Sequence, residues 1–515
     1  MKTLIAVIFI AIFIGIIFNN WIGPEIGWNP FKSPIRIIIK IIKFIFNTIF
    51  MLFRFIFQDL IYKNSGIYGS ANFLTGYKKQ KLISVFKDGL VIDGINRISL
   101  ERSFSHVLVS AASGAGKTVK YVIPNILNLN NSAVIFDPSG ELYKLTSGYL
   151  NTKGFNIKVI NVTEVNQSLQ YNPLYRANTH TEISKIADIL IRTAYSNSSG
   201  NEEFWNNSAK NILTILIRCL KNEPVQYQNL ANLRHLINNF GTDGSPLNNF
   251  IMRTADQHTF NEYKGFLTSD PKLRLNVIST ARTALEKFSD PDLCQLTAGE
   301  SLNFESLRTE KTAIFIQIPE SEILYYQFFT KLLYQDLFRY SMKMPEAGQE
   351  MPIMFILDEF ANTGKIDDFK TIITTARKRK VSFSIILQSY SQLEAEYGKE
   401  TASTIINGGI SGHIFLPGLD QGMCELLQRR LGKKTVLHQQ RGSIGKKTEI
   451  SKDLMTAEEI RTMPDEEGLF FHSNFKPVKL NVTPYYKNEE LLRRTKIPAP
   501  ILNQGAGIRL EYLNL

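Results

Sequence analysis

Cysteine is scarce in this sequence, which has three cysteines in 515 residues. Cys219, Cys294 and Cys424 lie far apart and form no CxxC or Cys/His pattern of the kind that a structural zinc site requires. We therefore expect three core thiols in a reducing compartment. Charged residues are also modest at 21%, against 44% apolar residues, and this ordinary balance argues against extensive disorder.

Acidic residues are outnumbered by basic ones, which gives a formal net charge of +12. Residues 1–62 contain six basic and two acidic residues, so +8 remains for the rest of the chain. A basic surface suits nucleic acid, and an excess of this size supports that interpretation without establishing it. The length is several times the ~150 residues of a usual domain, so we expect more than one compact unit.

Charges are absent from the first long apolar run, which extends from Thr3 to Ile22. As a helix, these 20 residues would cross the roughly 30 Å of a bilayer's hydrocarbon core, so we predict a transmembrane helix. A cleaved signal peptide is the alternative, but the run is too long for one and no small-residue cleavage site follows it.

A second apolar segment, residues 34–62, carries a narrow polar stripe. At about 100° per residue its polar side chains fall within a sector of roughly 60°. They are Arg36, Lys40, Lys43, Asn47, Arg54 and Gln58. Such a helix either lies in the interface with its stripe toward lipid headgroups or spans the bilayer with the stripe facing protein. Residues 1–62 are thus predicted to be a membrane anchor of one or two transmembrane helices.

Beyond residue 62, short β-branched runs alternate with helical stretches, which is typical of an α/β domain with a parallel sheet. One such run, His106–Ser110, precedes a loop of small residues, Ala111–Thr118, and a helical stretch from Val119. Strand, small-residue loop, Lys-Thr and helix is the arrangement of a phosphate-binding loop. Its first position holds Ala111 in place of the usual Gly, which we expect to be tolerated because that residue ends the strand.

The chemistry of nucleotide binding explains the residue types in this loop. Small side chains let backbone N–H groups wrap the phosphates, Lys117 places a charge near the β and γ oxygens, and Thr118 offers a hydroxyl to Mg²⁺. The expected nucleotide-binding residues are Ala112, Ser113, Gly114, Ala115, Gly116, Lys117 and Thr118.

Two further apolar runs end in polar residues that suit ATP hydrolysis. The first, residues 352–359, would deliver Asp358 to Mg²⁺ and Glu359 to the attacking water. The second, residues 382–389, ends in Gln388, whose amide would sense the γ-phosphate or orient water unless it is simply solvated.

A basic cluster, residues 377–380, lies between those two runs. It either interacts with the negative pole of a helix end or supplies an arginine to the γ-phosphate held by a neighbouring subunit.

In their order along the chain, these features resemble those of the type IV coupling proteins, the TraG/TraD-type ATPases of conjugation and type IV secretion. Short motifs on both sides of the phosphate loop and in the second catalytic half carry the resemblance. They are Tyr68–Asn72, Ile123–Asn125, Asp137–Glu141, Tyr171–Leu174, Leu357–Phe360, Leu387–Ser389, Gln392–Leu393 and Tyr397–Gly398. Each motif is weak alone, but their order is specific and the resemblance covers nearly the entire chain.

The resemblance implies an α/β fold, a RecA-like P-loop ATPase domain with an inserted all-α domain and an N-terminal transmembrane region. Lys117 and Asp358 are separated by 241 positions, too many for one crossover, and the stretch between them is mainly helical. The expected division is a membrane anchor (1–62), the first part of the nucleotide-binding domain (63–180), the all-α domain (181–300), the second part (301–490) and a C-terminal tail (491–515).

Residue roles follow by position. The resemblance implies catalytic roles for Lys117, Glu359, Gln388 and Arg377, and Mg²⁺ binding by Thr118 and Asp358. Arg377 matches the family's proposed trans arginine, although Arg379 and Lys380 lie close enough to substitute for it.

The implied function is a membrane-anchored ATPase that recruits a DNA–protein complex and drives its translocation. The implied cofactors are ATP and Mg²⁺, and the implied partners are single-stranded DNA, relaxase and relaxosome proteins, secretion-channel components and membrane lipid. Assembly as a homo-hexamer in the inner membrane, with the ATPase domain in the cytoplasm, is also expected. The alternatives are a coupling ATPase for protein effectors, a chromosome-pumping ATPase, and a docking receptor in which nucleotide only switches assembly.

Overall fold

The computed structural model describes residues 67–196, 201–240, 245–348, 350–439, 447–502 and 507–515. The predicted membrane anchor, residues 1–62, lies outside these ranges. Within them, no helix has both the length and the apolar character needed to cross a membrane. Residues Gly66–Leu515 group by their contacts into one compact unit, and the expected boundaries at 180, 300 and 490 stay predictions.

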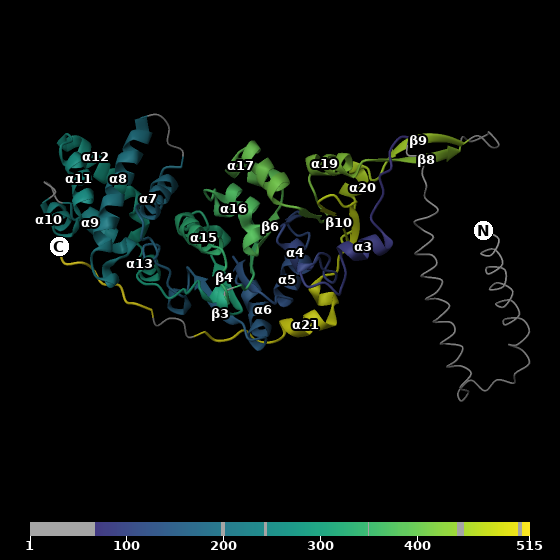
Figure 1. The fold of residues 1–515 in the computed structure, drawn as a ribbon, viewed down its shortest axis with the longest axis horizontal. Helices are drawn as coiled ribbons and strands as arrows, with labels where there is room; N and C mark the ends of the chain where they lie inside the picture. The colour runs from purple at the N-terminus through teal and green to yellow at the C-terminus, as the bar shows by residue number, and fades with distance from the viewer. Residues whose placement is uncertain (1–66, 197–200, 241–244, 349, 440–446, 503–506) are drawn as a thin grey trace, which may run out of the picture. The chain divides into compact units, whose positions relative to one another are not determined.

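A nine-stranded sheet organises the described part of the chain (Figure 1). Its order is β11-β10-β7-β1-β6-β5-β2-β4-β3. All neighbouring strands from β7 to β3 pair in parallel, whereas β10 pairs antiparallel with both β7 and β11. The strands are β1 (Val107–Ser110), β2 (Ser132–Phe136), β3 (Asn156–Asn161), β4 (Thr312–Gln317), β5 (Ile353–Leu357), β6 (Val381–Leu387), β7 (Gly412–Phe415), β10 (Glu467–His472) and β11 (Val478–Asn481). The predicted α/β class, with a mostly parallel sheet, is confirmed.

Helices cover both faces of the sheet, since alternate side chains of each strand point to opposite faces. Val107 and Val109 of β1 belong to one core together with α5 and α6, whereas Leu108 belongs to the opposite core together with α15 and α16. In that second core, Phe338 of α15 lies edge-on to Phe355 of β5, with 5.1 Å between the ring centroids. These helices are α5 (Ile123–Leu127), α6 (Glu141–Thr152), α15 (Gln327–Ser341) and α16 (Phe369–Thr375).

Between β3 and β4, the described residues form helices and turns without a strand. The longer helices are α7 (His180–Ala194), α8 (Asn201–Lys221), α9 (Leu230–Asn238), α10 (Ser245–Thr254), α11 (Gln257–Leu267), α12 (Pro271–Ala284) and α13 (Pro291–Leu296). We call residues 180–296 the helical insertion. α12 begins at Pro271 because the Asp270 side chain caps it and proline suits the first position of a helix.

The chain beyond β7 adds a third core and then turns back along the unit. Leu427 and Ile460, from α19 and α20, pack there with Phe415 and Leu469 of the sheet. The elements of this region are α19 (Gln421–Leu431), the hairpin β8 (Lys433–Gln439) and β9 (Lys447–Asp453), α20 (Ala457–Arg461) and α21 (Glu489–Thr495). Two short helices, α17 (Tyr390–Tyr397) and α18 (Lys399–Ser403), lie between β6 and β7. The described residues after α21 form neither helix nor strand, and Figure 1 shows them running from α21 toward the helical insertion.

Candidate active site

The loop after β1 has the backbone that its sequence predicts. Gly114 and Gly116 have φ values of 78° and 80°, in the left-handed region that favours glycine. A Cβ added at Gly114 would meet nothing within 4 Å, so the backbone conformation, and not a lack of space, requires glycine there. Ala111 is fully buried and is absent from the positive-φ residues, which explains why this position accepts a Cβ.

A short π-helical turn, Thr118–Val122, connects the loop to α5. Turns of this type are rare and often occur at functional sites. Lys120, in the middle of the turn, is buried, and its ammonium donates to the Ala115 carbonyl of the loop at 2.7 Å and to the Asp465 carbonyl at 2.8 Å. Sequence reasoning missed Lys120, because nothing in its spacing distinguishes it from a solvated lysine.

Asp358 and Glu359 follow β5 directly and meet the loop at the carboxyl edge of the sheet. Lys117 Nζ lies 2.8 Å from Glu359 Oε1 and 3.5 Å from Asp358 Oδ1. The Thr118 hydroxyl donates to Asp358 Oδ2 at 3.4 Å. The fold therefore brings together four of the residues that the sequence singles out, although about 240 positions separate the two halves of the site.

Burial and ion pairing both shift the pKa values in this cluster. Burial raises the pKa of Asp358, and the neighbouring Glu359 charge adds to this effect while Lys117 opposes it. Burial lowers the pKa of Lys117, but the ion pairs with Asp358 and Glu359 outweigh it, so that the pKa is raised overall. A lysine that stays protonated beside two acids is suited to bind a more highly charged anion.

Asp358 Oδ1 is a buried oxygen without a hydrogen-bond partner. Together with the Thr118 hydroxyl it offers the hard oxygen ligands that Mg²⁺ prefers. The described residues contain no group of three or more His, Cys, Asp or Glu side chains that could hold a metal by themselves. This pair fits a Mg²⁺ that takes its other ligands from phosphate oxygens and water.

Glu359 is held in an unusual conformation. Its φ of 54° is a left-handed value that is strained for a residue with a side chain, and such strain clusters at active sites. The Asn362 amide donates to Glu359 Oε2 at 2.8 Å, and the Gln388 amide donates to Oε1 at 3.4 Å. Gln388 reaches this position because β6 lies between β1 and β5. Asn362 was missed from the sequence, where only its spacing of three from Glu359 could have pointed to it.

The structure does not bring Arg377 to the site of its own chain. Arg377 precedes the amino end of β6, whereas Gln388 follows its carboxyl end, and seven strand residues span about 23 Å. Its side chain is 59% exposed and pairs with Glu101 at 3.0 Å. Arg379 donates to the Met342 and Thr375 carbonyls, and Lys380 pairs with Glu350, so both candidate substitutes have partners.

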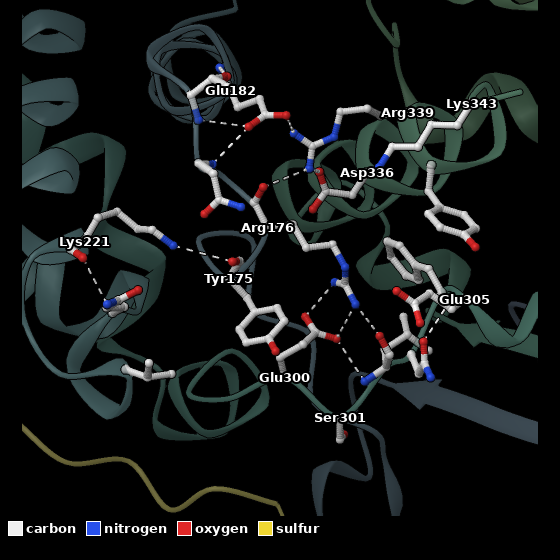
Figure 2. A pocket seen from close by; sticks show the side chains of 18 of the residues that line it. Tyr175, Arg176, Glu182, Lys221, Glu300, Ser301, Glu305, Asp336, Arg339 and Lys343 are labelled. Atoms are coloured by element: carbon white, nitrogen blue, oxygen red, sulfur yellow. Dashed lines mark hydrogen bonds and ion pairs between the residues drawn. The ribbon is translucent and has the colours of Figure 1, made fainter.

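A cavity of about 1180 Å³ lies where the helical insertion meets α15 (Figure 2). Arg176 and Glu300 form an ion pair of 2.9 Å there, and Arg339 pairs with Glu182 and Asp336. Burial raises the pKa of Glu300 to about 7 despite Arg176. These side chains pair with one another, so we assign the pairs to the packing of the insertion and not to the candidate site.

The three predicted core thiols are buried and free. Their compartment stays a prediction.

Comparison with known proteins shows which protein family the chain matches. A family model described as Type IV secretory system Conjugative DNA transfer matches residues 67–506. Protein VirD4 of Rhizobium radiobacter is 24% identical over 436 residues, which cover 79% of this chain and 61% of VirD4. Conjugal transfer protein TraG of Escherichia coli is 21% identical over 443 residues, which cover 77% of this chain and 69% of TraG. This chain thus spans about three fifths of the length of that VirD4 relative.

Solved structures of similar fold include the plasmid coupling protein TrwB in complex with the non-hydrolysable GTP analogue GDPNP. The TM-score is 0.61 at 17% identity, and the match covers 81% of this chain and 96% of TrwB. TrwB in complex with ADP and Mg²⁺ matches with a TM-score of 0.57 at 16% identity, over 80% of this chain and 94% of TrwB. At these identities the likeness concerns the fold alone.

Proposed function

We propose, from the premise that this chain belongs to the Type IV secretory system Conjugative DNA transfer family, that it is an ATPase which couples hydrolysis to DNA transfer. One observation carries the proposal: a lysine, a hydroxyl, two acids and an amide that follow three strands meet, each within 3.5 Å of at least one of the others. The nucleotide-bound TrwB structures support nucleotide as the ligand. In this proposal the site belongs to a RecA-like P-loop domain with an inserted all-α domain and an N-terminal transmembrane region.

In the proposed reaction, each residue of the site has a separate role. The backbone of Ala112–Thr118 and the side chain of Lys117 would bind the phosphates. The side chains of Thr118 and Asp358 would hold Mg²⁺, which neutralises phosphate charge when bound. Glu359 would accept the proton of the attacking water. Since Lys117 and Gln388 both donate to Glu359 Oε1, each must turn toward phosphate before that oxygen is free to accept a proton.

Arg377 would act on the nucleotide of a neighbouring subunit in a hexameric ring. Its exposure and its place at the opposite edge of the sheet support this role, because it is too far from the site of its own chain. An arginine supplied in trans stabilises the charge of a phosphoryl-transfer transition state.

The proposed partners are single-stranded DNA, relaxase and relaxosome proteins, secretion-channel components and membrane lipid. Anchoring in the inner membrane, with the ATPase unit in the cytoplasm, rests on the apolar sequence of residues 1–62. The same motor acting on protein effectors is the second candidate. One relative is named a type IV secretion system-coupling protein and another a conjugal transfer protein, so these names do not restrict the cargo to DNA.

ATP turnover of the full chain, with and without single-stranded DNA, tests the proposal. We expect Lys117→Ala and Glu359→Gln to abolish turnover, while Lys144→Ala, at an exposed position, leaves it unchanged. Unchanged turnover in the first two variants would exclude the catalytic assignment and leave a nucleotide-switched docking receptor. Stimulation by DNA distinguishes DNA cargo from protein cargo.

A further inference from the structure

Four basic side chains from distant parts of the chain gather at the amino edge of the sheet. They are Arg97, Lys153, Lys311 and Arg494. Lys153 comes shortly before β3 and Lys311 directly before β4, and these two strands pair in parallel. The candidate active site lies at the carboxyl edge, and the six residues of β4 span about 20 Å between the two edges. A ligand held at the amino edge is therefore separate from a nucleotide at the candidate site.

The loop that leads into β2 holds three of the four cations. Arg97 and Arg494 both donate to Asn128 Oδ1, at 2.6 and 3.2 Å. The Lys153 ammonium donates to Asn130 Oδ1 at 3.0 Å. These acceptors are neutral amides, so they position the cations without cancelling their charge.

Two aromatic rings connect the fourth cation to the other three. Arg494 Cζ and Lys153 Nζ lie over the Tyr149 ring, 4.7 and 5.8 Å from its centroid. Lys153 Nζ and Lys311 Nζ lie over the Phe155 ring, 6.0 and 5.9 Å from its centroid. Cation–π contacts of this length hold a charge in place and use none of its hydrogen-bond donors. The cations are thus positioned with donors to spare.

Acidic side chains neutralise only part of this charge. Glu490 pairs with Arg494 at 3.1 Å, but Arg493 shares the same carboxylate at 2.6 Å. Glu310, next to Lys311 in the chain, accepts a side-chain amide hydrogen bond at 3.0 Å instead. Within the described ranges, the Lys311 ammonium forms no ion pair or hydrogen bond, so all three of its donors are available.

The positive charges in the cluster repel one another. Burial lowers the pKa of Arg97, and the charge of Arg494 adds to this effect more than the charge of Asp88 opposes it. Burial and the charges of the other three cations lower the pKa of Lys153 to about 8. Like charges held together disfavour the charged forms, and a bound anion would relieve this repulsion.

The chemistry of the cluster fits a chain of phosphates. All four side chains are only partly exposed, which favours a narrow strand over a flat bilayer surface. We propose that this cluster binds the phosphate backbone of single-stranded DNA. Lysine and arginine contacts to phosphate carry no sequence information, so binding is independent of the bases. The inference rests on the proposed DNA-transfer function and adds to it a DNA site remote from the nucleotide.

Binding of a fluorescent oligothymidylate to the full chain, measured by anisotropy over a range of salt concentrations, tests the site. Lys311→Gln removes one charge without losing a hydrogen bond or ion pair of the described residues. Lys153→Gln with Lys311→Gln removes two charges, and Lys153→Arg with Lys311→Arg keeps both. The matched control is Lys144→Gln with Lys370→Gln, at two exposed lysines elsewhere.

Each phosphate contact with a single strand contributes about 0.7 to the slope of log K against log salt. We expect this slope to fall by about 0.7 in Lys311→Gln and by about 1.4 in the double Gln variant. The control and the double Arg variant should keep the wild-type slope. Basal ATP turnover should stay unchanged in every variant, because the cluster lies at the opposite edge of the sheet. If the double Gln variant loses basal turnover, Lys311→Gln alone decides.

The outcomes separate this site from the proposed function. A wild-type slope in both Gln variants would overturn the site alone. The same result together with lost binding of short-chain phosphatidylglycerol would overturn it in favour of a lipid site. Absence of DNA binding by the wild type would instead contradict DNA as the cargo of the proposed function.

Discussion

Lys117 Nζ lies 2.8 Å from Glu359 Oε1, so the proposed phosphate-binding lysine is paired with the proposed catalytic base. Both side chains are largely buried, at 12% and 18% exposure, and the pair is therefore stronger than an ordinary surface ion pair. In the proposed function, phosphate would compete with Glu359 for this ammonium, so the base itself would weaken nucleotide binding. One hydrogen bond would then couple nucleotide binding to hydrolysis.

Glu359→Gln should consequently separate the two activities. We expect kcat to fall by about 10²–10⁴-fold because the general base is lost. The Kd for ATP should fall by up to about tenfold, because the competing charge is gone. Isothermal titration with ATP and a turnover assay check both effects, with the exposed Glu164→Gln as the control. Weaker ATP binding in Glu359→Gln would contradict the competition.

Lys120→Met should impair nucleotide binding from outside the phosphate site. Losing two charge-assisted bonds to the Ala115 and Asp465 carbonyls should let the loop relax. We expect KM for ATP to rise by about tenfold or more, on the basis of ~1.5–3 kcal/mol for hydrogen bonds to a charged group. Lys144→Met, at an exposed lysine, is the matched control, and an unaltered KM in Lys120→Met would remove Lys120 from the loop's support.

The alternation of β-branched runs with helical stretches was sufficient to predict the α/β class. The ends of two apolar runs located the small-residue loop after β1 and the acid pair after β5. These features are local, because in each case a strand ends and the singled-out residues follow it along the chain. Asn362 and Lys120 could not be found in this way, since each matters only through a hydrogen bond that the folded chain creates. The hairpin β8–β9 was also missed.

Contacts between distant segments explain the remaining differences. The predicted tail, residues 491–515, begins within α21, and its course depends on Gln170, Asn232 and Gln295, which lie hundreds of positions earlier. From the sequence alone, polar residues of this kind are expected to be exposed to solvent. Only the fold shows that their amides bind backbone.

Arg377→Ala should reduce ATP turnover without weakening nucleotide binding, because Arg377 lies away from the site of its own chain. A trans arginine contributes about 10³–10⁵-fold to kcat. Lys378→Ala, at the adjacent exposed residue, should leave turnover unchanged. Mixed hexamers in which one subunit lacks Arg377 give the decisive measurement: they should lose activity at the neighbouring subunit's site.

Glu300 should make stability depend on pH. Its pKa in the folded state is about 7, above the ordinary value of 4.5, chiefly because of burial. The folded state therefore keeps a proton that the unfolded state releases, and the free energy of unfolding falls as pH rises from about 4.5 to 7. The fall should amount to on the order of 3 kcal/mol.

Urea unfolding of the wild type and Glu300→Gln across this pH range measures the effect as a difference between the two proteins. The wild type should gain stability relative to the variant as pH falls from 7 to 4.5. Glu305→Gln, whose carboxyl lies nearby at the exposed rim of the same cavity, should follow the wild type. A pH-independent difference between wild type and Glu300→Gln would contradict the assignment.

In the proposed mechanism Asn362 is a positioning residue, because it would act on the reaction through Glu359 Oε2. Asn362→Ala should lower kcat by about tenfold through lost orientation of the base, with the Kd for ATP unchanged, since the amide of Asn362 binds the base. Asn362→Asp instead places a second negative charge beside Glu359, which disfavours its ionised form. The acid limb of the pH–kcat profile should then move to higher pH in the Asp variant and stay in place in the Ala variant. A purely structural role would lower kcat in both variants without moving that limb, so the profile separates positioning of the base from simple support of the turn.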